Sequence, residues 1–154
     1  MIRLNPTELK AVSDYVYSIC AVSLDQSKGY LIEGRLAHIV DELRLPSYGQ
    51  LIARARTDAT GALNRRIIDS ITTNETLFFR DTAPFDALRH KVIPDLIDRR
   101  TRANSNAPIR IWSAACSTGQ EIYTIGIVLK ELLGNPVKYN IRLLGTDISD
   151  QAVQ

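Results

Sequence analysis

The 154-residue sequence predicts an all-α N-terminal domain of four helices, followed by the first βαβ part of an α/β domain. Two observations predict this combination. Apolar residues recur at helical spacing through residues 5–70, and capping residues stand where helices would begin. Further along, β-branched runs at 109–113 and 140–145 flank an apolar helical pattern at 121–133. This second pattern is typical of two parallel strands joined by a crossover helix.

The first two helices have clear start and stop signals. The first is expected to begin at Asn5, because Asn is a favoured N-cap, Pro6 fits the first turn, and Glu8 can return a hydrogen bond from the N3 position. The apolar residues that then repeat at helical spacing are Leu9, Val12, Val16 and Ile19. A second helix is expected at about residues 26–43, and Pro46 prevents its continuation.

Two shorter helices and a connecting region follow. Ser47 and Asp58 are candidate caps for the shorter helices. A helical stretch from about residue 83 is interrupted by Pro94, and the polar loop 103–108 lacks any periodicity. We therefore divide the chain into a helical domain at 1–70, a linker with connecting helices at 71–108, and the start of an α/β domain at 109–154.

The α/β part is expected to be incomplete. The sequence ends seven residues after Asp147, where a further crossover would begin. A parallel sheet of two strands cannot bury both of its faces. We expect the chain to be an inactive fragment of a longer protein, and its exposed strand edge predicts self-association.

Composition excludes several classes of protein. The net charge is +2 and the two signs are interspersed, so no general affinity for nucleic acid is expected. No window approaches the roughly 18 apolar residues of a membrane span, and a cytoplasmic protein without membrane insertion is predicted. Cys20 and Cys116 have no metal or disulfide spacing, so we expect free thiols and no metal site. No histidine is placed beside Cys116, which favours a small buried residue over a nucleophile.

A ligand site is predicted where the first strand of the α/β part meets its helix. The strand at 109–113 runs into small residues and a single glycine before the helix that contains Glu121. Small side chains let a ligand approach the backbone, and the helix start offers unpaired N–H groups. Because the G-x-G-x-x-G pattern is absent, a single adenosyl ligand without phosphates fits better than a dinucleotide.

Two acids near this loop have both a functional and a structural interpretation. Asp147 follows the second strand, where a carboxylate can accept hydrogen bonds from both ribose hydroxyls, but it could also cap a following helix through Ser149. Glu121 could attract a cationic group of the ligand. Its place in the first helical turn is favoured by the helix dipole whatever its function.

The segment 72–80 has a similar ambiguity. Thr72 and Glu75 have the spacing of a capping box, and Asn74 could cap a helix by itself. Arg80 follows the apolar run 77–79, which we expect to be buried. A guanidinium beside a buried run needs a partner, and a ligand carboxylate is the natural candidate.

A group of arginines marks the last two helices of the helical domain. The group consists of Arg54, Arg56, Arg65 and Arg66. Such a group is usually a solvated face, but it could also meet an acidic protein partner.

The motifs resemble those of the CheR-type methyltransferases, which use S-adenosyl-L-methionine to methylate glutamates of bacterial chemoreceptors. The similar strings are TTNETLFFR at 72–80, RIWSAACSTGQEIYT at 110–124 and GTDI at 145–148, in the family's order. The helical part resembles the family's N-terminal domain. The resemblance covers the whole chain, which corresponds to about the first half of the family's usual length. It implies that the α/β part is the start of an S-adenosylmethionine-dependent methyltransferase (Rossmann-like) domain.

The resemblance also implies the roles of individual residues. The implied cofactor-binding residues are Asn74, Thr76, Arg80, Ala115, Glu121 and Asp147. Arg80 is expected to be catalytic, near the amino-acid end of the cofactor and the transferred methyl, and Asp147 is expected to hold the ribose. The implied product is S-adenosyl-L-homocysteine, and the implied partners are the cytoplasmic helices of methyl-accepting chemoreceptors.

The expected function is therefore methyl transfer to glutamate carboxylates, which gives glutamate methyl esters in chemotactic adaptation. Two alternatives remain. One is a non-catalytic receptor-binding module built on the helical domain. The other is a nucleotide-dependent oxidoreductase, which the missing glycines of the loop disfavour.

Overall fold

A computed structural model describes residues 2–154. The chain forms two compact units. The first unit comprises residues up to Thr73 together with Ile148–Gln151, and the second comprises Asn74–Asp147 together with Ala152–Gln154. None of the helices formed by residues 2–154 is both long and apolar enough to cross a membrane.

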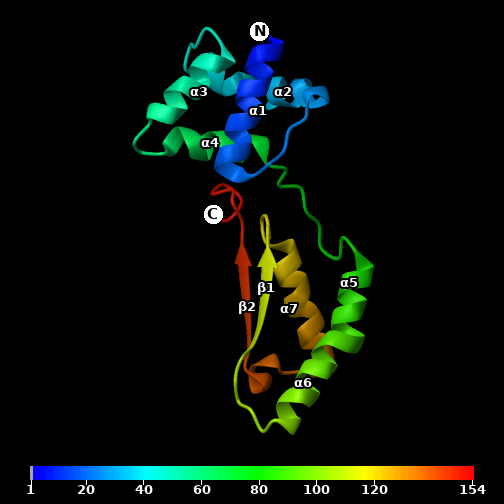
Figure 1. Cartoon of the computed structure of the whole chain (residues 1–154). Coiled ribbons are helices and arrows are strands. Elements are labelled where there is room, and N and C mark those ends of the chain that lie inside the picture. The colour runs from blue at the N-terminus through cyan, green and yellow to red at the C-terminus, as the bar shows by residue number, and fades with distance from the viewer. Residues whose placement is uncertain (1) are drawn as a thin grey trace. The chain divides into compact units, whose positions relative to one another are not determined.

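The first unit contains the four predicted helices (Figure 1). They are α1 (Pro6–Cys20), α2 (Gly29–Glu42, preceded by the 3-10 turn η1, Gln26–Lys28), α3 (Tyr48–Thr57) and α4 (Ala62–Ile71). Their apolar faces form one core, which includes the fully buried side chains of Val12, Val16, Ile32, Leu36, Ile39, Leu51 and Ile67. Removing these faces from water is the main stabilising contribution to such a bundle.

The predicted caps are confirmed, one of them in a different geometry. Asn5 and Glu8 form the expected capping box, and Ser47 Oγ accepts a hydrogen bond from the Gln50 amide at 3.3 Å. Asp58 acts from outside α4, because Gly61 occupies the N-cap position with φ 66°. The Asp58 carboxylate nevertheless accepts a hydrogen bond from the Leu63 amide at 2.8 Å.

Polar contacts also fix the two places where the chain leaves and re-enters the first unit, after α4 and at Ile148–Gln151. The Arg35 guanidinium donates to the Thr72 carbonyl at 2.9 Å and to Thr73 Oγ1 at 2.7 Å. The buried hydroxyl of Ser149 donates to Asp69 Oδ1 at 2.7 Å, which holds Ile148–Gln151 on α4.

Tyr48 is expected to make the stability of the first unit depend on pH. Its ring is buried, and this burial, followed by the nearby carboxylates of Glu33 and Asp41, raises the pKa of Tyr48 above its ordinary value. A raised pKa in the folded state means that stability is fully present below the ordinary pKa and is lost as the pH rises through the folded one. Urea unfolding from pH 9 upwards should therefore show an alkaline loss that is smaller in Tyr48→Phe. An equal loss in both proteins would contradict this account.

The second unit begins with three consecutive helical segments. They are α5 (Thr82–Ala87), the π-helical turn η2 (Leu88–Val92) and α6 (Ile93–Arg102). The expected interruption at Pro94 takes the form of this wide turn rather than a break. Proline lacks an N–H and its ring clashes with the carbonyl four residues earlier, and the wider turn just before it accommodates both effects.

The βαβ unit then follows as predicted. It consists of β1 (Ile109–Ala114), α7 (Gln120–Leu133), the 3-10 turn η3 (Pro136–Tyr139) and β2 (Ile141–Thr146). The two strands are parallel, with Ile109 opposite Ile141 and Ala114 opposite Thr146. Parallel strands present their carboxyl ends at the same edge, so the residues after β1 and after β2 are neighbours.

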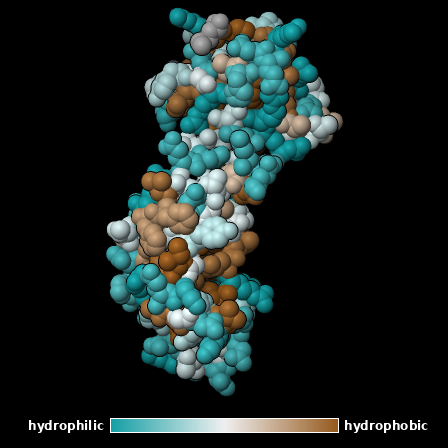
Figure 2. All heavy atoms as spheres, turned by 180° about the vertical axis from the view of Figure 1, so that it is seen from behind, coloured by the Kyte–Doolittle hydropathy of each residue, from teal (hydrophilic) through white to brown (hydrophobic). Residues whose placement is uncertain are grey.

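Among the described residues of the second unit, α7 and Ile93 cover one face of this sheet. Ile111 and Ile141 pack with Ile125 and Leu129 of α7 and with Ile93. Trp112 and Leu144 point away from this cluster and are exposed. Figure 2 shows hydrophobic residues exposed on the surface of the second unit.

Candidate functional site

Ser117 joins three segments of the second unit that carry predicted site residues. Its amide donates to Asp147 Oδ2 at 2.7 Å, and its hydroxyl donates to the Asn74 carbonyl at 2.6 Å. The Ser117 side chain is buried, and both hydrogen bonds are partly shielded from water. The β1–α7 loop, the end of β2 and the segment that begins at Asn74 therefore meet at one place. Ser117 was not among the site residues predicted from the sequence, although its small polar side chain in the loop was a signal.

The β1–α7 loop has an unusual backbone conformation. Ala115, Ser117 and Gly119 all lie in the left-handed region, with φ of 60°, 50° and 97°. Residues other than glycine adopt this region rarely, and such strain clusters at ligand sites. The Cys116 amide donates to the Thr146 carbonyl at 3.0 Å, which fixes the loop against β2 and leaves the small side chain of Ala115 exposed.

Glu121 lies in the first turn of α7, where the helix dipole stabilises its charge. The buried hydroxyl of Ser113 donates to Glu121 Oε1 at 2.7 Å. This contact from β1 holds the carboxylate at the N-terminus of α7, beside the loop.

Asp147 is followed by bends and turns at residues 148–154, and no helix occurs within these seven residues for it to cap. The Ser149 hydroxyl is bonded to Asp69, and a turn follows at residues 150–152. The Asp147 carboxylate instead faces the β1–α7 loop through Ser117.

The capping-box interpretation of Thr72 and Glu75 is also wrong. Thr72 is the C-cap of α4, where its hydroxyl donates to the Ile68 carbonyl at 2.9 Å. Its ψ of 150° turns the chain out of the helix, and the next helix begins only at Thr82. Segment 74–80 is therefore a loop whose side chains are not needed to cap a helix.

The expectation that residues 77–79 are buried is wrong. Leu77, Phe78 and Phe79 are 69%, 54% and 42% exposed. Phe79 has a φ of 53°, and this turn keeps the run at the surface, with an edge-to-face contact to Phe85 and a 3.3 Å hydrogen bond from its amide to Thr124 Oγ1.

Arg80 is accordingly exposed, and the desolvation argument for its partner does not hold. Its guanidinium donates to the Glu75 carbonyl at 3.2 Å. The segment folds around a pocket of about 290 Å³ that is lined by Glu75, Thr76, Leu77 and Arg80. Two predicted site residues, Thr76 and Arg80, thus line one small pocket.

Gly145 is a further residue of this region that the sequence analysis did not single out. A Cβ atom at Gly145 would lie 3.0 Å from Cys116 Sγ and 3.3 Å from Cys116 Cβ. The absence of a side chain at Gly145 lets the loop lie against β2.

We expect Gly145→Ala to lower the free energy of unfolding by about 1–2 kcal/mol, because a tightly packed position must accept an additional methyl group. Urea unfolding would measure this loss, and Cys116→Ala in the same chain should recover part of it. Gly34→Ala is the control, since nothing lies within 4 Å of the new methyl group. Losses that simply add in the double variant would contradict the proposed contact.

No group of three or more His, Cys, Asp or Glu side chains that could hold a metal ion occurs within residues 2–154. Cys116 is buried, as the sequence predicts, and both cysteines are free.

Comparisons with known proteins agree with the division of the chain into two compact units. Residues 7–72 match the family model of the CheR methyltransferase all-alpha domain, and residues 74–154 match that of the CheR methyltransferase SAM binding domain. SAM is S-adenosyl-L-methionine. The boundary between the two matches coincides with that between the two units, after Thr73.

Named relatives support the same family. The chain is 38% identical over 139 residues to chemotaxis protein methyltransferase Cher2 of Pseudomonas putida, covering 88% of this chain and 49% of the relative. It is also 38% identical over 139 residues to chemotaxis protein methyltransferase 1 of Pseudomonas aeruginosa, covering 88% and 48%. The chemotaxis protein methyltransferase of Borreliella burgdorferi is 35% identical over 149 residues, covering 96% and 52%. The chain spans about half the length of the curated relatives it matches.

Proposed function

Because the chain belongs to the CheR methyltransferase family, we propose that it is part of an enzyme that methylates glutamate carboxylates of chemoreceptors. The products are glutamate methyl esters and S-adenosyl-L-homocysteine. The matched SAM-binding domain identifies the cofactor as S-adenosyl-L-methionine. The observation that carries the proposal is the meeting of Asn74, the β1–α7 loop and Asp147 at Ser117.

The residues of this region suit an adenosyl ligand. We propose that the strained loop with its exposed Ala115 side chain receives the nucleoside and that Asp147 accepts hydrogen bonds from the ribose. Asn74, Thr76 and Arg80 would hold the amino-acid end, where Arg80 can pair with a carboxylate. Glu121, held at the N-terminus of α7, would attract the amino group.

The chemistry asked of the protein is mainly positioning. When bound, the cofactor supplies a methyl group on a sulfonium, which is electrophilic without further activation. A glutamate side chain has a pKa of about 4.3 and is ionised at neutral pH, so no general base is required. The protein must align the carboxylate oxygen with the methyl and exclude water, which contributes up to about 7–11 kcal/mol in favourable cases.

The proposed partners are the cytoplasmic helices of chemoreceptors, which would place the enzyme in the cytoplasm. Self-association is a further expectation, because the apolar side chains of Trp112 and Leu144 are exposed side by side on one face of the sheet. Sedimentation at increasing concentration would measure it.

Ligand-dependent thermal unfolding tests the proposed cofactor against the two alternatives. S-adenosyl-L-homocysteine at about 100 times its dissociation constant should raise the free energy of unfolding by about 2.7 kcal/mol. NAD should have no effect. A shift with NAD alone would support an oxidoreductase, and no shift with either ligand would support a receptor-binding module.

Methyl transfer itself is tested with the full-length protein. Receptor-containing membranes and cofactor labelled in the methyl group should give protein-bound label that alkali releases as methanol, which is the behaviour of an ester. Label that survives alkali would contradict glutamate as the acceptor.

A further inference from the structure

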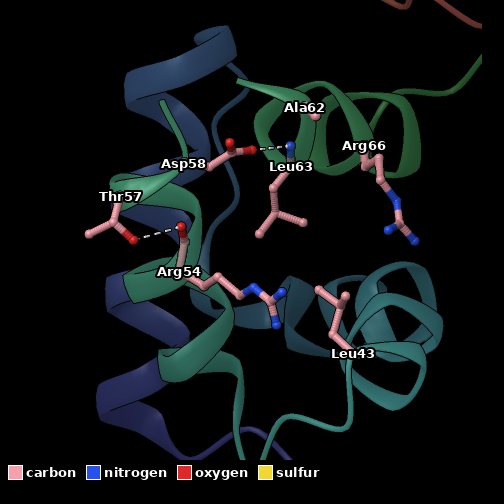
Figure 3. A pocket seen from close by; sticks show the side chains of 7 residues that line it. All are labelled: Leu43, Arg54, Thr57, Asp58, Ala62, Leu63 and Arg66. Atoms are coloured by element: carbon pink, nitrogen blue, oxygen red, sulfur yellow. Dashed lines mark hydrogen bonds between the residues drawn. The ribbon is translucent and has the colours of Figure 1, made fainter. Parts of the chain in front are cut away.

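A second pocket lies in the first unit, outside the residues assigned to the cofactor. Its volume is about 410 Å³, and it lies where the end of α2, α3 and the start of α4 meet. The lining residues are Leu43, Arg54, Thr57, Asp58, Ala62, Leu63 and Arg66. Figure 3 shows the Arg54 side chain extending across this space toward Leu43, with Leu63 pointing into it from α4. The pocket therefore combines apolar side chains with polar and charged ones, and the Arg54 guanidinium lies within it.

Arg54 differs from the other three arginines of α3 and α4. The contacts of those three are Arg56 over the ring of Tyr15 at 5.3 Å, Arg65 with Asp150 at 3.7 Å, and Arg66 with Glu42 at 2.5 Å. The Arg54 guanidinium makes no hydrogen bond, ion pair or ring contact with the residues 2–154 that the structure describes. Among the four arginines of α3 and α4, Arg54 is therefore the one whose guanidinium has no contact partner among the described residues.

The acid of the pocket is already engaged elsewhere. Asp58 accepts hydrogen bonds from the Thr60 amide at 2.9 Å, the Thr60 hydroxyl at 2.6 Å and the Leu63 amide at 2.8 Å. These bonds, the Thr60 hydroxyl first, hold the pKa of Asp58 below its ordinary value. Its charge is directed at the N-terminus of α4, where the helix dipole is positive.

We propose that this pocket binds an acidic side chain of a protein partner, with the carboxylate paired to Arg54. A guanidinium binds one carboxylate with two parallel hydrogen bonds. Leu43, Ala62 and Leu63 suit the aliphatic stem of such a side chain and its apolar neighbours. A phosphate, with a charge of about −1.5 to −2, would call for a second unpaired cation and would lie near Asp58. The proposed pairing involves the helical unit alone and does not depend on methyl transfer.

An NMR titration of the whole chain tests the proposal. The probe is the blocked hexapeptide acetyl-Leu-Ala-Glu-Ala-Ala-Leu-amide, and the signals followed are the arginine Nε–Hε groups and the leucine methyl groups. We expect saturable shifts at Arg54, Leu43 and Leu63. The peptide with Gln in place of Glu should bind at least tenfold more weakly, and Arg54→Gln should weaken binding of the Glu peptide by the same factor.

Controls separate this pocket from general charge effects. Lys10→Gln removes the same charge from an exposed position of α1 and should leave binding unchanged. Arg54 has no partner to lose in the fold, so the unchanged spectrum of Arg54→Gln would verify its folding. Equal binding by Arg54→Gln, or shifts spread over all arginines, would overturn the proposal. Acetate or inorganic phosphate binding as tightly as the peptide would also overturn it, because the pocket would then be a small-anion site.

Discussion

Replacing Arg80 by alanine in the full-length enzyme is expected to lower kcat/KM for methyl transfer by about 10²- to 10³-fold while the fold stays intact. Arg80 lines the small pocket of segment 74–80, and its guanidinium is exposed apart from a hydrogen bond to the Glu75 carbonyl. A positioned cation that orients a reacting or binding carboxylate commonly contributes this much. A methyl-transfer assay with receptor membranes would measure the loss.

Binding measurements on the same variant would distinguish the two carboxylates that are proposed as partners of Arg80. Weaker binding of S-adenosyl-L-homocysteine would indicate the carboxylate of the cofactor, and a raised KM for the receptor with unchanged cofactor affinity would indicate the incoming glutamate. Arg99→Ala removes an exposed arginine from α6 and serves as the matched control. Near-normal turnover by Arg80→Ala would refute the role.

Asp147→Asn is expected to weaken binding of S-adenosyl-L-homocysteine by about 30- to 100-fold. The Ser117 amide donates to the Asp147 carboxylate at 2.7 Å, and the substitution keeps one oxygen that can accept this hydrogen bond. It removes the charge and the second oxygen that two ribose hydroxyls require, and hydrogen bonds to charged groups contribute about 1.5–3 kcal/mol each. Isothermal titration calorimetry would measure the affinity.

The matched control for Asp147 is Asp86→Asn, an exposed acid of α5 in the same unit. It should leave the affinity unchanged. Thermal unfolding without ligand distinguishes a lost ligand contact from a lost loop contact, because only the latter lowers the stability of the free protein. Wild-type affinity in Asp147→Asn would contradict a ribose-binding role.

Local sequence signals predicted the helices and strands well. The capping box of Asn5 and Glu8 and the Ser47 cap join residues only three positions apart, so the sequence contains all the atoms involved. The same reasoning failed at Thr72 and Glu75, which have capping-box spacing but follow the end of α4. A local pattern cannot report which backbone groups an earlier helix already uses.

For the candidate site, too, some features could be predicted from the sequence and others could be seen only in the tertiary structure. The sequence by itself determined the family, through strings at 72–80, 110–124 and 145–148, and it placed the acid after β2. Only the tertiary structure revealed Ser117, which bonds residues 30 and 43 positions away, and Gly145, whose missing side chain admits Cys116. It also decided that the run before Arg80 is exposed. Burial depends on what distant segments cover, and the apolar character of a run does not specify that.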